Sequence, residues 1–361
     1  MTPLARLLAD RIRAEGPLSL ADYMADCLLH PKHGYYATRD PFGRAGDFIT
    51  APEISQMFGE LVGLALAQAW LDAGSPHPFL LVEIGPGRGT LMADAWRATR
   101  AVPGFHAAAR LWLIEASPHL RGVQARALSG VAVDWAEALD ELPEAGPLFL
   151  IGNEFLDALP IRQFTRQGAG WAETRVGLTA DGTALTLGRA APQPVAALDH
   201  RLDDTRPGQI VEICPAAEAA AATIAARIAA QGGLALLIDY GDAQSLGDTF
   251  QALRGHQSVD PLAEPGLADL TAHVAFEPLA RAARAAGADA TGPVPQGLWL
   301  ERLGVTARAQ ALATRLTGTA RDSHIAAHRR LTHPGEMGQL FKVLAIHRPG
   351  IIPPGLAGDI R

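Results

Sequence analysis

The sequence predicts an α/β protein built on a doubly wound, mostly parallel β-sheet. Between residues 80 and 152, short apolar runs alternate with segments of helical periodicity. Alternation at this spacing is typical of a parallel sheet with helices on both faces. The chain has 361 residues and is 48% hydrophobic and 19% charged, so it can bury a substantial core.

Residues 1–75 are expected to form a helical N-terminal region that carries a lid loop. A long loop rich in Gly, Pro and aromatic residues separates two segments of helical periodicity. The second of these helices is expected to begin with a capping box, in which Thr50 accepts from the backbone of Glu53 and the Glu53 side chain reaches back. Gly59 and Gly63 lie on one face of that helix, which permits close packing.

The segments that follow complete the predicted organisation. Residues 76–160 contain the apolar runs FLLVEIG, ARLWLIEA, VAVDW and PLFLIGNE, which are expected to be strands of the cofactor-binding half of the core. An inserted β-rich element is expected over 161–215. The second half of the core, 216–348, adds the strands LALLIDYG and QLFKVLAIHR and contains a substrate-side insertion over 242–335. Residues 349–361 are expected to be an irregular tail.

Composition argues against several classes of protein. The net charge is −7 and there is no basic block, so a nucleic-acid partner is not expected. No apolar run reaches the ~18 residues of a membrane span, and the first residues lack the apolar core of a signal peptide. Cys27 and Cys214 cannot form a disulfide framework, and His30 and His33 lack partners at metal-ligand spacing. We therefore expect a cytoplasmic protein without membrane insertion and without a metal.

The stretch LVEIGPGRGT predicts a cofactor site. It places Gly85, Gly87 and Gly89 directly after the first buried strand. In an open parallel sheet, ligands bind at the carboxyl ends of strands, where glycines let the backbone approach the ligand and the next helix directs its N–H groups at it. The dinucleotide pattern G-x-G-x-x-G is not met, because the third glycine comes one residue early and Thr90 stands in its place.

Acidic residues near this loop distinguish between cofactors. Glu83 lies two residues before the first glycine and suits a cationic ligand better than a pyrophosphate. Glu115 ends the second strand, where an acid can bind both ribose hydroxyls of either NAD or S-adenosylmethionine. Asp134 and Trp135 end the third strand and are expected to hold and cover an adenine. The whole pattern favours S-adenosyl-L-methionine, with an NAD-dependent oxidoreductase as an alternative.

Several strings together resemble the MidA-like methyltransferases. They are GDFITAPEISQMFGE, EIGPGRGTLMAD, NEFLDALPIRQF, LIDYG, GDTFQALRGH with PGLADLTAHV, and GQLFKVLAI, in order along nearly the whole chain. The resemblance implies a seven-stranded Rossmann-like methyltransferase sheet, S-adenosyl-L-methionine as cofactor, and methyl transfer to a protein arginine. The family includes a mitochondrial assembly factor of respiratory complex I, so a core subunit of that complex is a candidate substrate.

The stretch NEFLDALP is expected to supply catalytic groups at the end of the fourth strand. A guanidinium stays protonated at neutral pH, and carboxylates such as Glu154 and Asp157 can grip it and orient one nitrogen. Asn153 is expected to contact the cofactor or the substrate, and His273 to line the substrate pocket or assist proton removal. The alternatives are an N-cap for Asn153, a first-turn dipole partner for Asp157 and a structural role for His273.

Two further segments are candidates for the substrate side. Asp47, Phe48, Ile49 and Thr50 are expected to form a lid over the cofactor, or else a plain helix-entry loop. Tyr240 ends the fifth strand and is expected to stack on the substrate, or else to pack in the core. Two other functions remain open at this level, a non-catalytic assembly factor and a small-molecule methyltransferase.

Overall fold

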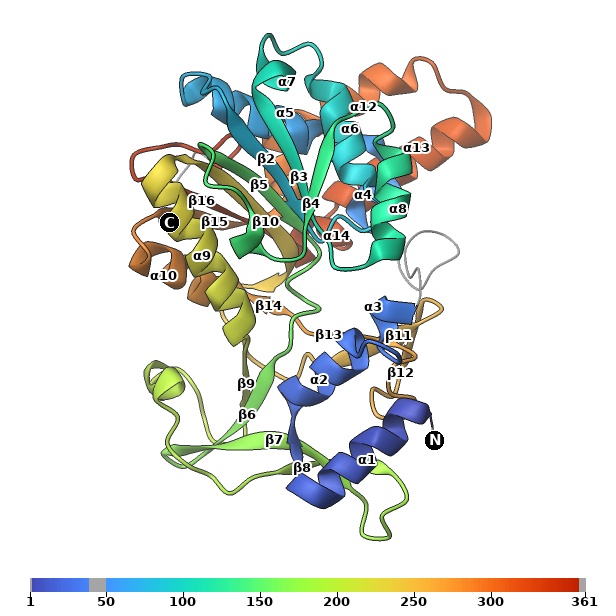
Figure 1. Cartoon of the computed structure of the whole chain (residues 1–361), viewed down its shortest axis with the longest axis vertical. Coiled ribbons are helices and arrows are strands. Elements are labelled where there is room, and N and C mark those ends of the chain that lie inside the picture. Colours follow the sequence, from blue (N-terminus) through green and yellow to red (C-terminus); the bar gives the residue numbers. More distant parts are fainter. Residues whose placement is uncertain (1, 39–49, 357–361) are drawn as a thin grey trace. The chain divides into compact units, whose positions relative to one another are not determined.

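The computed structural model describes residues 2–38 and 50–356 (Figure 1). The chain divides into two compact units. Unit 1 consists of residues 1–48, 157–217 and 244–275, and unit 2 consists of residues 49–156, 218–243 and 276–361. The β-rich element expected over 161–215 lies in unit 1.

Unit 2 contains a mixed sheet with helices packed on it. Its strands are β2 Phe79–Ile84, β3 Ala109–Ile114, β4 Val133–Ala136, β5 Leu148–Asn153, β10 Gly233–Asp242, β15 Asp289–Pro295 and β16 Phe341–His347. Its helices are α4 Ala51–Ile54, α5 Gln56–Asp72, α6 Thr90–Thr99, α7 Phe105–Ala108, α8 Pro118–Ala127, η1 Leu139–Glu141, α9 Pro215–Gln231 (whose first turn belongs to unit 1), α10 Phe276–Ala285, α11 Gln296–Arg302, α12 Val305–Ala313, α13 Gly318–Thr332 and α14 Met337–Leu340.

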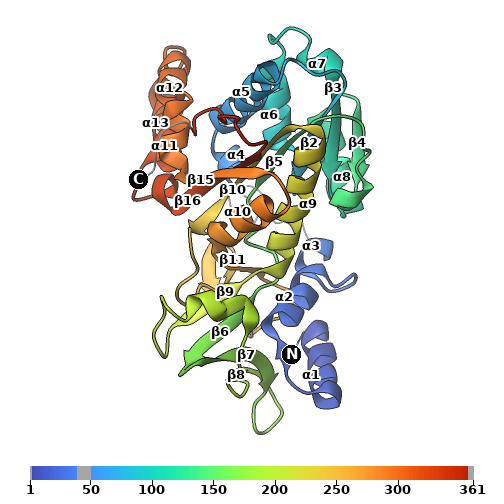
Figure 2. The same cartoon turned by 90° about the vertical axis from the view of Figure 1, so that its left-hand side faces the viewer.

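The order of these strands is β15-β16-β10-β5-β2-β3-β4. Strands β10, β5, β2, β3 and β4 run parallel to one another, whereas β16 runs antiparallel to both β10 and β15. The α/β class is therefore confirmed, and the sheet is mixed. Helices α11, α12 and α13 pack together at one side of the unit (Figure 2).

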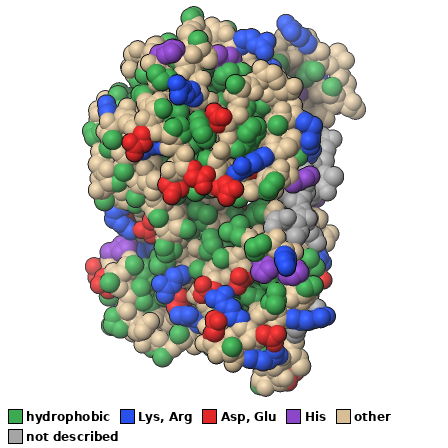
Figure 3. All heavy atoms as spheres, viewed as in Figure 1, with side chains coloured by type: hydrophobic (Ala, Val, Ile, Leu, Met, Phe, Trp, Pro, Cys, Tyr) green, Lys and Arg blue, Asp and Glu red, His purple; other side chains and the backbone are tan. Residues whose placement is uncertain are grey.

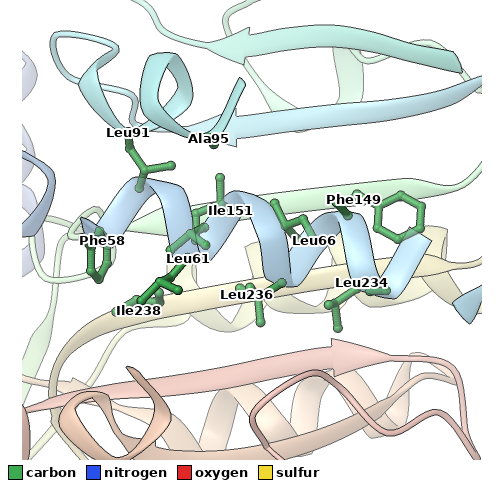
Figure 4. Packing of buried hydrophobic residues seen from close by; sticks show 14 of the residues in the cluster. Phe58, Leu61, Leu66, Leu91, Ala95, Phe149, Ile151, Leu234, Leu236 and Ile238 are labelled. Carbon is green, nitrogen blue, oxygen red and sulfur yellow. The ribbon is translucent and has the colours of Figure 1, made fainter. Parts of the chain in front are cut away.

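Apolar side chains cover both faces of this sheet. Figure 4 shows Phe58, Leu61 and Leu66 of α5 packed against alternate residues of β5 and β10, such as Ile151 and Leu236. The intervening residues of the two strands, among them Leu150 and Leu237, point to the opposite face and are also buried. In the view of Figure 1, α9 lies in front of the sheet and α5 behind it. Continuous burial of these strands explains why their sequences read as unbroken apolar runs.

The predicted close packing at Gly59 and Gly63 is confirmed. These residues of α5 face α6, and a Cβ placed on Gly63 would lie 2.6 Å from the Cα of Ala95. A Cβ on Gly59 would lie 2.8 Å from the Cβ of Asp94. The two helix backbones therefore approach at a distance that only glycine allows.

The described part of unit 1 is built from short strands, three N-terminal α-helices and one 3-10 helix. Its elements are α1 Pro3–Glu15, β1 Leu18–Ser19, α2 Leu20–Leu29, α3 Tyr35–Thr38, β6 Arg162–Gln167, β7 Gly170–Leu178, β8 Leu185–Arg189, η2 Ala196–Arg201, β9 Ile210–Ile213, β11 Gln251–Arg254, β12 Gln257–Val259, β13 Asp269–Thr271 and β14 Val274–Ala275. One sheet has the order β1-β7-β6-β9 with β8 beside β7, and a second has the order β12-β11-β13.

A buried polar network ties segments of unit 1 together. The carboxylate of Glu212 accepts hydrogen bonds from the backbone N–H and the hydroxyl of Thr249 and from the side chain of Gln163. The same amide of Gln163 also donates to Asp248, 2.8 Å away, and its oxygen accepts from Thr174. Asp248 and Thr249 of the string GDT therefore have a role in folding, because their side chains are hydrogen-bonded inside unit 1.

The surface does not carry a large basic field on the face shown in Figure 3, where Lys and Arg side chains are scattered among acidic and neutral ones. Among the described residues, no helix is long and apolar enough to span a membrane. The same residues contain no group of three or more His, Cys, Asp or Glu side chains arranged to hold a metal ion.

Candidate cofactor and active site

The glycine loop between β2 and α6 has a backbone that requires glycine. Gly85, Gly87 and Gly89 have φ values of 65°, 52° and 80°, in the left-handed region that L side chains rarely adopt. A Cβ on Gly85 would also lie 2.9 Å from the Cβ of Phe155. Gly89 is the N-cap of α6 and offers no capping side chain. The first N–H groups of α6 thus depend on partners from elsewhere.

Two carboxyl groups supply bonds at the start of α6. Glu83 is 3% exposed and accepts a hydrogen bond from the backbone N–H of Met92, in the first turn of the helix. Burial raises the pKa of Glu83 to about 8, so the group is mostly protonated at neutral pH. The hydroxyl of Thr90 donates to the carboxylate of Glu53. A neutral Glu83 weakens the argument that its charge attracts a cationic ligand, and its contact with the cofactor stays a prediction.

The capping box expected at Thr50 is wrong. Thr50 is the N-cap of α4, but its side chain makes no capping bond, and Glu53 turns to Thr90 instead. The helix also breaks at Ser55, whose φ of −161° is extended, before α5 begins. The pattern S/T-x-x-E therefore marks the start of a four-residue helix, but its acid, Glu53, binds Thr90 of α6 and not the backbone of Thr50.

Glu115 lies directly after β3, and its carboxylate is held by hydrogen bonds, among them one from the backbone of Ala116. Its carboxylate accepts from the backbone N–H of Ser117 at 2.8 Å and from the side-chain amide of Gln124 at 3.1 Å. Burial raises the pKa of Glu115, and these two bonds oppose that shift by favouring the charged form. An oriented carboxylate beside the glycine loop is suited to bind a pair of hydroxyls.

Gln124 of α8 is a site residue that the sequence analysis missed. Its amide donates to the carbonyl oxygen of Gly87 at 2.8 Å as well as to Glu115, and its oxygen accepts from the indole N–H of Trp135 at 2.9 Å. Nothing in the helical pattern of α8 marks one glutamine among several polar residues. Only the packing of that helix against the loop identifies it.

The structure separates the two residues expected over an adenine. Trp135 is half-buried and joins the Gln124 network, whereas Asp134 is exposed. Successive residues of a strand point to opposite faces, so the two side chains cannot line one surface from β4.

β5 ends at Asn153, and Glu154 follows it with an unusual backbone conformation. Glu154 has a φ of 53°, which is uncommon for a residue other than glycine and costs about 1–3 kcal/mol. Its Oε1 atom accepts from the backbone N–H of Ala51 at 2.8 Å and from the side-chain amide of Asn153 at 3.1 Å. Oδ1 of Asn153 is buried and has no hydrogen-bond partner within the described part of the chain. Glu154 thus caps α4, and Asn153 presents an acceptor that the described residues do not satisfy.

The end of β10 lies beside this turn. Asp239 is fully buried and accepts from the backbone N–H groups of Leu156 and Tyr240, each at 2.9 Å. Tyr240 packs edge-on against Phe341, with ring centroids 5.5 Å apart. Core packing, one of the two interpretations of Tyr240, is therefore observed; a contact of its ring with substrate stays a prediction.

The remaining candidates fall in unit 1 or outside the described residues. Asp157 is buried, and its carbonyl accepts from the backbone N–H of Ala272 at 3.0 Å. His273 is exposed, and its backbone N–H donates to the hydroxyl of Thr249. Asp47, Phe48 and Ile49 of the expected lid lie outside the described residues, and Thr50 is the only one of the four that can be placed.

Comparisons with known proteins identify the family of this chain. A family model described as "Putative S-adenosyl-L-methionine-dependent methyltransferase" matches residues 61–294. The proteins named "Protein arginine methyltransferase NDUFAF7, mitochondrial" from Danio rerio and Homo sapiens are 35% and 34% identical to this chain, over 94% and 96% of it and 85% and 83% of their own lengths. The Drosophila melanogaster homolog of that name is 36% identical, over 97% of this chain and 85% of its own length.

The chain belongs to this family of methyltransferases. A Burkholderia thailandensis protein solved with bound S-adenosyl-homocysteine has a TM-score of 0.80 and 31% identity, covering 99% of this chain and 92% of its own. The methyltransferase accordingly uses S-adenosyl-L-methionine, and the NAD alternative is set aside. The glycine turn, the Glu115 carboxylate and the unsatisfied acceptor of Asn153 fit such a cofactor, which offers a ribose and an amino group.

One expectation is contradicted by the same comparison. We expected a cytoplasmic protein, but these curated relatives are mitochondrial proteins by name. The lack of a signal-peptide pattern and of a long apolar run does not identify a compartment.

Proposed function

We propose that this methyltransferase transfers the methyl group to an arginine of a protein, with the cofactor over the loop Gly85–Gly89 and its ribose on Glu115. The placement rests on one observation above all. The left-handed glycine turn after β2 and the half-buried carboxylate of Glu115 after β3, which accepts hydrogen bonds from Ser117 and Gln124, lie at the carboxyl ends of adjacent parallel strands. The arginine acceptor rests on the relatives named protein arginine methyltransferases. The proposal takes the sheet of unit 2 as the seven-stranded Rossmann-like sheet of such enzymes.

In this mechanism the chain positions the acceptor and removes water. S-adenosyl-L-methionine supplies an electrophilic methyl group when bound. Glu154 grips the substrate guanidinium and orients one nitrogen, since its carboxylate follows β5 at the carboxyl end of the sheet and its Oε1 is held in place by Ala51 and Asn153. Asp157, His273 and Tyr240 are assigned to the substrate side. The positive charge remains on the guanidinium after transfer of the methyl and loss of one proton.

The substrate is proposed to be a core subunit of respiratory complex I. The choice of complex I rests on the resemblance of the motifs to a family that includes an assembly factor of that complex. The chain also matches its curated relatives along most of their length. Mass spectrometry of complex I subunits from the host with and without this gene tests the proposal. A methylated arginine that disappears with the gene supports it, and identical methylation in both strains contradicts it.

Cofactor placement is tested separately on the purified protein. Glu115→Ala should weaken S-adenosyl-homocysteine binding by ~30-fold or more in isothermal titration, because charge-assisted bonds to the ribose contribute about 2–4 kcal/mol. Unchanged affinity in a folded variant would show that Glu115 does not hold the ribose.

A further inference from the structure

We propose that Gln124 is a positioning residue of the cofactor site, whose buried amide holds the Glu115 carboxylate, the Gly87 carbonyl and the Trp135 indole in one arrangement. This inference rests on the proposed placement of the cofactor. Gln124 acts on the cofactor through the three groups that it binds.

The hydrogen bonds of Gln124 use its whole amide. The side chain is 0% exposed. Both donor positions of Nε2 are occupied, by the carbonyl of Gly87 at 2.8 Å and the carboxylate of Glu115 at 3.1 Å, while Oε1 accepts from Trp135 at 2.9 Å. Only one orientation of the amide is compatible with these neighbours, because a flipped amide would set its oxygen against two acceptors and its NH₂ against a donor.

The three groups come from three different segments of unit 2. Gly87 belongs to the loop after β2, Glu115 follows β3, and Trp135 lies on β4. The backbone of Gln124 also packs on the loop, since a Cβ placed on Gly89 would lie 3.4 Å from its Cα. One amide thus fixes the loop, the ribose-binding acid and the aromatic residue relative to one another.

The direction of the Glu115 side chain depends on this amide. Its other donors are the backbone N–H groups of Ser117 and Ala116, which are its own chain neighbours and do not tie it to another element. Arg121 adds its charge nearby, and its own Nε donates to the backbone carbonyl of Glu115, so it does not orient the carboxylate. Among the described residues, Gln124 donates the bond that ties a carboxylate oxygen of Glu115 to another element. Preorganisation of this kind strengthens binding by reducing the ordering cost paid when the ligand binds.

The test compares two ligands on matched variants. Gln124→Leu removes all three hydrogen bonds and keeps a side chain of similar volume. Gln296→Leu is the control. Gln296 is also 0% exposed, but among the described residues its side chain bonds only the carbonyl of Leu331. Dissociation constants are measured by isothermal titration for S-adenosyl-homocysteine and for its 2′-deoxy analogue, which lacks a ribose hydroxyl. Melting temperatures are recorded in parallel to separate loss of stability from loss of positioning.

We expect Gln124→Leu to weaken binding of S-adenosyl-homocysteine about tenfold and binding of the 2′-deoxy analogue only about two- to threefold, since one bond to Glu115 is already absent there. Gln296→Leu should lower the melting temperature without changing the ligand ratio, which is the dissociation constant of the 2′-deoxy analogue divided by that of S-adenosyl-homocysteine. Equal weakening for both ligands, or wild-type affinity in Gln124→Leu, overturns the positioning role.

A second variant keeps the test decisive if Gln124→Leu does not fold. Trp135→Phe removes only the indole N–H that orients the amide, and it should reduce the same ligand ratio by about two- to threefold; an unchanged ratio overturns the inference. Failure of the cofactor placement itself looks different, since Glu115→Ala would then bind both ligands as the wild type does.

Discussion

Replacing Glu154 by Gln tests whether the charge of this side chain serves methyl transfer or only the fold. The structure shows that Oε1 already accepts from the backbone N–H of Ala51 and from Asn153. The amide oxygen of a glutamine can accept the same two bonds, so the cap on α4 survives the substitution. What disappears is the negative charge.

The expected magnitudes differ for stability and for rate. Loss of a charge at the N-terminus of a helix costs about 0.3–1 kcal/mol, which corresponds to a fall of roughly 3 °C or less in melting temperature. Loss of one preorganised electrostatic contact to a reacting group lowers the rate by about 10²–10³. Glu154→Gln should therefore nearly abolish methylation while leaving the melting temperature and the affinity for S-adenosyl-homocysteine close to those of the wild type.

The assay uses the host strain in which the gene is replaced by the variant. The fraction of the methylated arginine is measured by mass spectrometry, and the purified variant supplies melting temperature and ligand affinity. Glu154→Ala is the contrasting variant, because it removes both the charge and the cap and should lower stability by about 0.5–2 kcal/mol. If Glu154→Gln supports normal methylation while Glu154→Ala is only less stable, Glu154 is a capping residue and the proposed grip on the guanidinium is wrong.

Three further predictions concern the same unit. Glu83 has a folded-state pKa of about 8, well above its ordinary value of 4.5, so its contribution to stability is fully present below pH ~4.5 and is lost as the pH rises to about 8. Glu83→Gln should therefore gain stability relative to the wild type between pH 5 and 8, by up to about 1.4 kcal/mol per pH unit in denaturant unfolding, and equal pH slopes would contradict the shift. Gly63→Val should lower stability by several kcal/mol, because its Cβ would lie 2.6 Å from Ala95, whereas Gly188→Ala, with nothing within 4 Å, should have little effect. Gly85→Ala should weaken S-adenosyl-homocysteine binding and stability together, because both the φ of 65° and the contact with Phe155 oppose a side chain.

The sequence predicted β2, β3, β4, β5, β10 and β16 because most of these strands are buried and end at glycines or acids, which leaves a strong local signal. It missed β15, which lies within the substrate-side insertion expected over 242–335 but pairs with β16 at the edge of the same sheet. It did not predict that residues 1–48, 157–217 and 244–275 form a unit of their own. Strand pairs such as β1 with β7 join residues far apart in the chain, and short apolar patterns do not specify such partners. Gln124 was missed for a related reason, since the partners that give it meaning lie on other elements.

The acids at the strand ends explain why functional and structural interpretations of such residues are hard to separate from sequence. Glu83 accepts from the first turn of α6, Glu115 from the N-cap of α8, Glu154 from the start of α4, and Asp239 from the turn after β5. For Glu83 and Glu115, the carboxyl end of a parallel strand faces the N-terminus of the next helix, so the acid meets both unpaired backbone N–H groups and any ligand bound at that edge. Glu154 and Asp239 instead meet backbone N–H groups of segments that are not next in the chain. A cap fixes the direction of a carboxylate, and a fixed carboxylate is what a ligand site needs. Alanine substitutions remove both properties at once, whereas substitution by the matching amide keeps the acceptor and removes the charge. The amide variants are therefore the ones that assign each of these four acids to the fold, to the ligand, or to both.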